Sequence, residues 1–64
     1  MEINHIHTTR SNIDKISEHM TVFSQPCEPE IIIDLDYAEM NGMIEFIEKI
    51  LETKVEGDYL HLTA

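Results

Sequence analysis

The sequence contains a single cysteine, only four basic residues and no uninterrupted apolar run longer than the three residues Ile31 to Ile33. One cysteine excludes a disulfide within the chain and favours a reducing compartment. The short apolar runs exclude a membrane-spanning helix, and the first residues lack the basic and apolar regions of a signal peptide. We therefore expect a cytoplasmic protein that does not bind membranes.

Signatures of catalysis are also missing. The chain has no Gly-rich phosphate loop, no Cys-x-x-Cys pair and no Ser/His/Asp set in a recognisable context. Its 64 residues leave little room for the walls of a deep substrate pocket. Cys27 lies between two prolines and beside acidic residues, which disfavour a reactive thiolate. We predict that the protein is not an enzyme and needs no cofactor.

Acidic residues are abundant, and most of them lie in one half of the chain. Residues 28–58 contain ten acids and two bases, a net charge of −8, whereas residues 1–27 contain three acids and two bases, a net charge of −1. Four bases among thirteen acids disfavour direct nucleic-acid binding, because phosphate neutralisation supplies most of its affinity. A strongly negative surface attracts basic surfaces, so we predict a basic protein partner.

The length allows one small domain over residues 1–64, with an α+β fold. We expect a small antiparallel sheet of three or four strands, with one long amphipathic helix packed on one face. The predicted strands cover residues 1–9, 30–37 and 58–63. Residues 12–20 fit either a short second helix, which we favour, or a strand, and the two prolines in residues 25–29 make that segment a connection.

The long helix is predicted over residues 38–53, with Asp36 as its N-cap. Gly42 either weakens this helix by roughly 1 kcal/mol relative to alanine or marks its true start, with Asn41 as the cap. Part of the apolar stripe of the helix could stay bare, which leaves a homodimer open as an alternative. The stripe consists of Met40, Met43, Ile44, Ile47, Ile50 and Leu51.

Two rows of acids are the candidate binding surface. If the helix covers Ile31, Ile33 and Leu35, the alternate residues of that strand point from the other face. Alternate residues on a strand lie about 6.6–6.8 Å apart, so a carboxylate row there would resemble a row of phosphates. The alternative is an acidic surface that only maintains solubility. The predicted partner-binding residues are Glu30, Ile32, Asp34, Asp36 and Tyr37 on the strand, and Glu45, Glu48 and Glu52 on the helix.

The histidines form a second, weaker pattern. His5 and His7 share a strand face, and His61 lies on the terminal strand. Pairing of these strands would bring three imidazoles together near Asp34 or Asp36, and Zn²⁺ binds three or four such ligands. A His-x-His pair without a second pair of ligands is a weak metal signal, so we predict no metal site. A pH-sensitive surface is the favoured interpretation.

The stretch from Glu30 to Leu62 resembles the short immunity proteins of bacterial polymorphic-toxin systems. The likeness rests on the apolar strand Ile31–Leu35, a helix rich in isoleucine and glutamate, and the closing segment Glu56–Leu62. It implies a non-enzymatic inhibitor that binds a toxin domain tightly through acidic residues, and it assigns no individual binding residue.

These observations predict a small acidic inhibitor of a basic protein partner, such as an immunity protein for a toxin nuclease. One alternative is a phage-encoded inhibitor or DNA mimic that acts on a host nucleic-acid-binding or defence protein. Another is a structural homo-oligomer, or a metal-binding module that uses its histidines.

Overall fold

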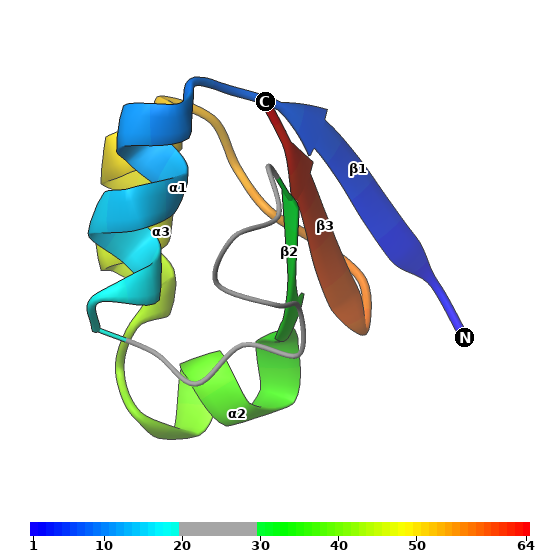
Figure 1. Cartoon of the computed structure of the whole chain (residues 1–64). Helices are drawn as coiled ribbons and strands as arrows, with labels where there is room; N and C mark the ends of the chain where they lie inside the picture. Colours follow the sequence, from blue (N-terminus) through cyan, green and yellow to red (C-terminus); the bar gives the residue numbers. More distant parts are fainter. Residues whose placement is uncertain (20–29) are drawn as a thin grey trace.

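A computed structural model describes residues 1–19 and 30–64, and in them three strands form one mixed sheet. Their bounds are Ile3–His7 (β1), Glu30–Asp34 (β2) and Tyr59–Thr63 (β3). The last strand, β3, lies between the other two (Figure 1). It runs antiparallel to β2 but parallel to β1, with Ile3 opposite Tyr59 and His7 opposite Thr63. The prediction of an antiparallel sheet is therefore wrong.

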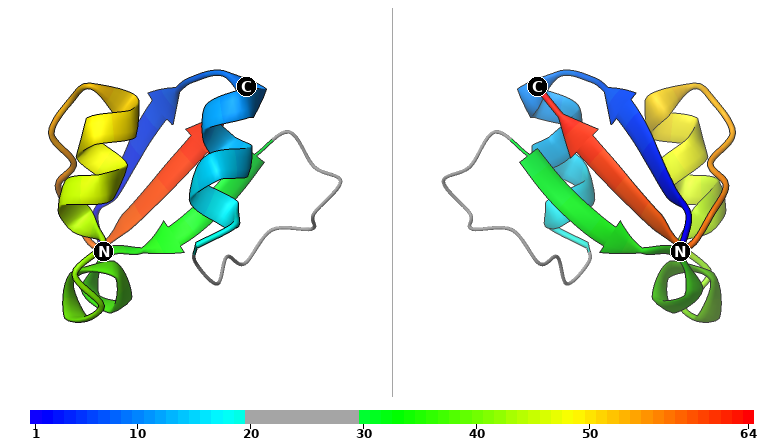
Figure 2. Two further views of the ribbon diagram at one scale, coloured as in Figure 1. Left: turned by 90° about the vertical axis from the view of Figure 1, so that its left-hand side faces the viewer. Right: turned by 90° about the vertical axis from the view of Figure 1, so that its right-hand side faces the viewer.

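The described residues form three short helices rather than one long one. Their bounds are Arg10–Ser17 (α1), Leu35–Met40 (α2) and Ile44–Leu51 (α3). Helices α1 and α3 cover one face of the sheet, and α2 lies at the end of β2 (Figure 2). No helix in these residues is both long enough and apolar enough to cross a membrane.

The predicted helix over residues 38–53 is wrong because the chain turns at Gly42. Gly42 has a φ of 69°, a left-handed conformation that ends helices and that glycine adopts without steric cost. The backbone N–H of Met43 donates to the carbonyl of Ala38 over 2.8 Å, which closes the turn. Asn41 is the C-cap of α2 rather than the N-cap of a following helix.

The predicted strand over residues 30–37 is three residues too long, because Asp34 begins a helix. One oxygen of the Asp34 carboxylate, Oδ1, accepts hydrogen bonds from the backbone N–H groups of Asp36 (3.0 Å) and Tyr37 (3.2 Å). These are the second and third residues of α2, so Asp34 is the N-cap, in place of Asp36. Asp36 and Tyr37 are thus helical and do not continue the strand.

The short helix predicted over residues 12–20 is present, with shifted ends. It begins at Arg10 after the N-cap Thr9, whose hydroxyl accepts a hydrogen bond from the backbone N–H of Asn12 over 3.1 Å. The helix ends at Ser17. The connection predicted at residues 25–29 lies outside the described residues.

The core lies between the sheet and the two helices on its covered face. Leu60 and Leu62 of the central strand are completely buried, and the predicted burial of Ile31, Ile33 and Leu35 is confirmed. Met40, predicted in the apolar stripe, is 85% exposed because α2 turns it away from the core. The other buried residues are Ile13, Ile16, Ala38 and Ile47.

Candidate functional site

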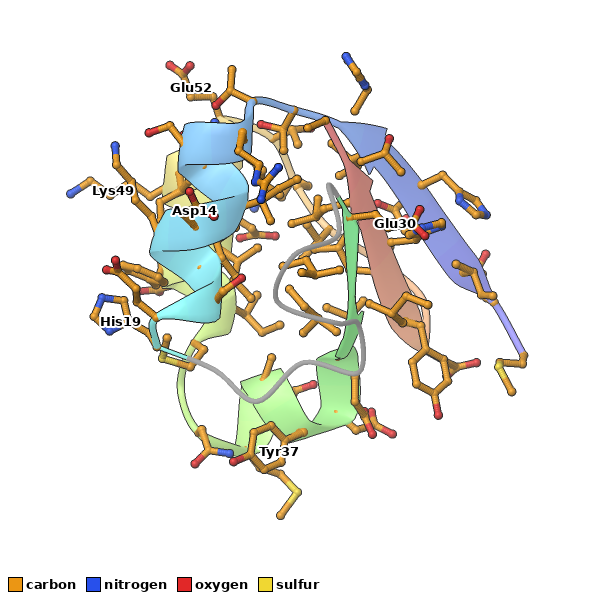
Figure 3. All side chains as sticks on the ribbon, viewed as in Figure 1. Asp14, His19, Glu30, Tyr37, Lys49 and Glu52 are labelled. Carbon is orange, nitrogen blue, oxygen red and sulfur yellow. The ribbon has the colours of Figure 1, made fainter. Side chains whose placement is uncertain are left out.

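The predicted acidic row on the strand does not form. Asp36 lies in α2, and the carboxylate of Asp34 caps that helix. Glu30 is on the open face of the sheet, where its Oε2 lies 3.0 Å from Nε2 of His61 (Figure 3). Ile32 lies beside His61 in the strand register and is only partly buried. The acids of this face therefore bind other groups of the same chain.

The predicted row on the helix is also divided. Oε2 of Glu48 accepts a hydrogen bond from the backbone N–H of Val55 over 3.0 Å, which fixes the segment that follows α3. Glu45 is exposed in the first turn of α3, and Glu52 is exposed at its C-cap. Of the three acids in this row, only Glu45 and Glu52 have carboxylates without a partner among the described residues.

Helix α2 presents an exposed surface that combines acids with large apolar side chains. Leu35 and Ala38 are the buried residues of this helix. Tyr37 is 45% exposed and Met40 is 85% exposed, so this short helix presents two large side chains to solvent. Tyrosine and methionine are enriched in protein interfaces, whereas isolated acids are not. The exposed residues of α2 are Asp36, Tyr37, Glu39 and Met40.

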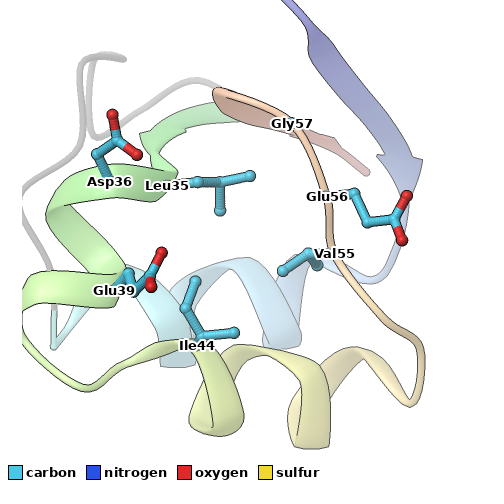
Figure 4. Close-up of a pocket in the computed structure, with 7 residues that line it drawn as sticks. All are labelled: Leu35, Asp36, Glu39, Ile44, Val55, Glu56 and Gly57. Carbon is cyan, nitrogen blue, oxygen red and sulfur yellow. The ribbon is translucent and has the colours of Figure 1, made fainter.

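A pocket of about 450 Å³ lies beside this helix. Three apolar side chains line it: Leu35 from α2, Ile44 from α3 and Val55 from the segment that leads to β3 (Figure 4). Its remaining lining comes from Asp36, Glu39, Glu56 and Gly57. The Glu39 side chain points toward the apolar groups, whereas the carboxylates of Asp36 and Glu56 lie at the rim and point away from them (Figure 4).

The acidic residues around the pocket have no cationic partner in the part of the chain that the structure describes. Within residues 1–19 and 30–64, the contacts between basic and acidic side chains are Arg10 with Asp14 at 3.8 Å and His61 with Glu30 at 3.0 Å, and neither involves the pocket. A lysine or arginine side chain has the matching chemistry, because its methylene groups pack on apolar surface while its charged end contacts carboxylates. The pocket can therefore accept one long basic side chain of another molecule.

Two of the three predicted histidines come together on the open face of the sheet. Nδ1 of His5 lies 3.2 Å from Nδ1 of His61, and the two rings meet edge to face with centroids 5.1 Å apart. His7 lies two residues further along β1, opposite Thr63. In the part of the chain that the structure describes, no group of three or more histidine, cysteine or acidic side chains is arranged to hold a metal ion.

The chain matches no protein-family model, and searches of curated proteins and of solved structures returned no match. The resemblance to short immunity proteins therefore remains a prediction from the sequence.

Asp36 and Tyr37 are among the binding residues predicted from the sequence, whereas Glu39, Met40 and Glu56 are not. Placing Glu39 and Met40 inside a long helix assigned Met40 to the core. Gly42 was the available signal in the sequence. A helix that ends at Gly42 is separate from the next helix, so Met40 need not share the buried face of that next helix. Glu56 had no local signal, because the fold of the segment after α3 decides its position.

Proposed function

We propose that this protein binds a basic segment of a protein partner through α2 and the adjacent pocket, and thereby inhibits that partner. The observation that supports the proposal most is the pocket itself, in which Leu35, Ile44 and Val55 are bordered by three acidic residues that have no cationic partner among the described residues. An arginine or lysine of the partner enters this pocket.

The exposed apolar side chains next to the pocket enlarge the contact. Tyr37 and Met40 lie on α2 together with Asp36 and Glu39, so apolar and charged contacts form on the same helix. Apolar groups at the centre of an interface supply most of the affinity, and the charges set orientation and partner choice.

The net charge of −9 acts at longer range. An excess of one sign accelerates encounter with a partner of the opposite sign, and salt screens this effect over about 10 Å at 0.1 M ionic strength. A partner that uses its basic surface to hold a nucleic acid would lose access to that surface once it is covered. This mode of action fits an immunity protein for a toxin nuclease.

The test compares two double variants with the same net charge. Asp36→Asn with Glu39→Gln removes two carboxylates from the pocket, and Glu18→Gln with Glu45→Gln removes two exposed carboxylates elsewhere. The probe is an arginine-rich peptide, titrated at low salt and followed by backbone amide NMR. We expect the pocket variant to bind about tenfold more weakly, which corresponds to ~0.7 kcal/mol for each exposed carboxylate, and the control to bind like the parent protein.

The NMR spectra also locate the contact. Amide signals of Ile44, Val55 and Gly57 are expected to shift during the titration of the parent protein. Equal weakening in both double variants, with shifts spread evenly over all acidic residues, would show that the charge acts only as a diffuse field and that the pocket is not the binding site. A pull-down from lysate of the source cell, washed at low and at high salt, then identifies the partner.

A further inference from the structure

The open face of the sheet carries a hydrogen-bonded series of side chains that the proposed partner contact does not use. It runs from His5 on β1 to His61 on β3 and on to Glu30 on β2, so it crosses all three strands. His5 is exposed and His61 is partly exposed, and no described helix covers this face (Figure 2). The imidazole pair is therefore accessible to solvent.

The contact with Glu30 determines which nitrogen of His61 faces His5. An ionised carboxylate only accepts hydrogen bonds, so Nε2 of His61 carries a proton and donates it to Oε2 of Glu30. In the neutral ring, Nδ1 then has a free lone pair, and that atom is the one 3.2 Å from Nδ1 of His5. With that tautomer of His61, the 3.2 Å contact is a hydrogen bond when Nδ1 of His5 carries a proton and donates it to this lone pair.

The separation of these two nitrogens also matches that of two ligands on one metal ion. Zinc binds imidazole nitrogens at about 2.0–2.1 Å with tetrahedral angles, which places two such nitrogens ~3.3 Å apart. The Nδ1 atoms of His5 and His61 are already at 3.2 Å. Histidines that bind metals usually donate their other N–H to a carboxylate, and Glu30 occupies that position for His61.

We propose that the Nδ1 atoms of His5 and His61 together bind a divalent transition-metal ion such as Zn²⁺, with Glu30 as the group that orients His61. The ion takes the place of the proton on Nδ1 of His5, and that proton moves through solvent to Nε2 of the same ring. This chain supplies two ligands, and water or a second molecule docked on the open face supplies the others. The proposal does not depend on the pocket beside α2.

Zinc titration by calorimetry at neutral pH tests the assignment. We expect His5→Ala and His61→Ala each to weaken Zn²⁺ binding at least tenfold, because either change leaves one ligand. Glu30→Gln should weaken it about 10- to 100-fold, as is typical for loss of a carboxylate that orients a ligand. His7→Ala is the matched control, since His7 lies on the same strand face and belongs to no described hydrogen-bonded pair, and it should bind Zn²⁺ like the parent.

Further measurements separate the site from the general acidity of the protein. Imidazole NMR should show the ring signals of His5 and His61 shifting together on addition of Zn²⁺, and excess Mg²⁺ should not compete, because it prefers oxygen ligands. The Asp36→Asn, Glu39→Gln variant should bind Zn²⁺ normally. Unchanged Zn²⁺ binding in His5→Ala, or equal losses in His7→Ala, would overturn the proposal. If His61→Ala fails to fold, the exposed position His5 still provides the test.

Discussion

Two accessible regions of the molecule, the surface around α2 and the open face of the sheet, use their acidic residues differently. On the sheet, Glu30 binds His61 and Asp34 caps α2. Around the pocket, Asp36, Glu39 and Glu56 have no ionic partner among the described residues. Position in the fold therefore matters more than the number of charges, because only the second group is free to bind another molecule.

The two surfaces also differ in the cation they suit. The pocket combines oxygen atoms with apolar side chains, which fits a long organic cation such as an arginine side chain. The sheet face presents two imidazole nitrogens 3.2 Å apart, which fits a transition metal. One acidic protein thus offers two chemically distinct sites for positive charge.

Gly57 lies between the pocket and the start of β1. Of the replacements considered, its replacement should destabilise the protein most. It lines the pocket, has a φ of 101°, and a Cβ there would lie 3.1 Å from the backbone carbonyl of Glu2. That carbonyl accepts hydrogen bonds from the N–H groups of Asp58 (2.8 Å) and Tyr59 (3.1 Å), which hold the start of β1 against β3. We expect Gly57→Ala to lower the free energy of unfolding by about 2–3 kcal/mol.

Gly42→Ala is the control for this prediction. Gly42 also has a positive φ, of 69°, but a Cβ there would meet no atom within 4 Å. Its replacement should cost only about 1 kcal/mol, from the backbone conformation alone. Urea denaturation of both variants measures the difference, and equal losses would show that the contact with Glu2 contributes nothing.

Asp34 tests whether a carboxylate on the sheet side is structural. Asp34→Ala removes the N-cap of α2 and should destabilise the protein by about 1 kcal/mol. Asp34→Asn keeps a capping oxygen and should be close to neutral in thermal denaturation. Binding of the arginine-rich peptide should be unchanged in Asp34→Asn. Weaker binding by that variant would show that Asp34 contacts the partner, as the sequence predicted.

The sequence was sufficient to predict the features that depend on local spacing. The burial of Ile31 and Ile33 and the terminal strand follow from apolar periodicity, which favoured a helix after the first strand but also fitted a strand there. The strand order did not follow, because the parallel pairing of β1 with β3 joins segments more than fifty residues apart. No local pattern specifies such a contact.

The errors on the strand part of the candidate site have one physical origin. A polar residue between a strand and a helix can continue the strand or cap the helix, and the alternation of Asp34 and Asp36 fitted the strand. The hydrogen bonds from the N–H groups of Asp36 and Tyr37 decide in favour of the cap. The approach of His5 to His61 was anticipated, whereas the role of Glu30 depends on the strand register and was not.

Glu52 provides the smallest effect and separates acids that bind from acids that do not. It is the C-cap of α3 and has a φ of 58°, a left-handed conformation that is strained for a residue with a side chain. Glu52→Gly should therefore stabilise the protein by about 0.5–1 kcal/mol, since glycine adopts this conformation without strain. Thermal denaturation measures the gain. Because Glu52 does not line the pocket, the variant should bind the arginine-rich peptide as tightly as the control variant Glu18→Gln with Glu45→Gln. A tenfold loss of affinity would place the contact along α3 instead of α2.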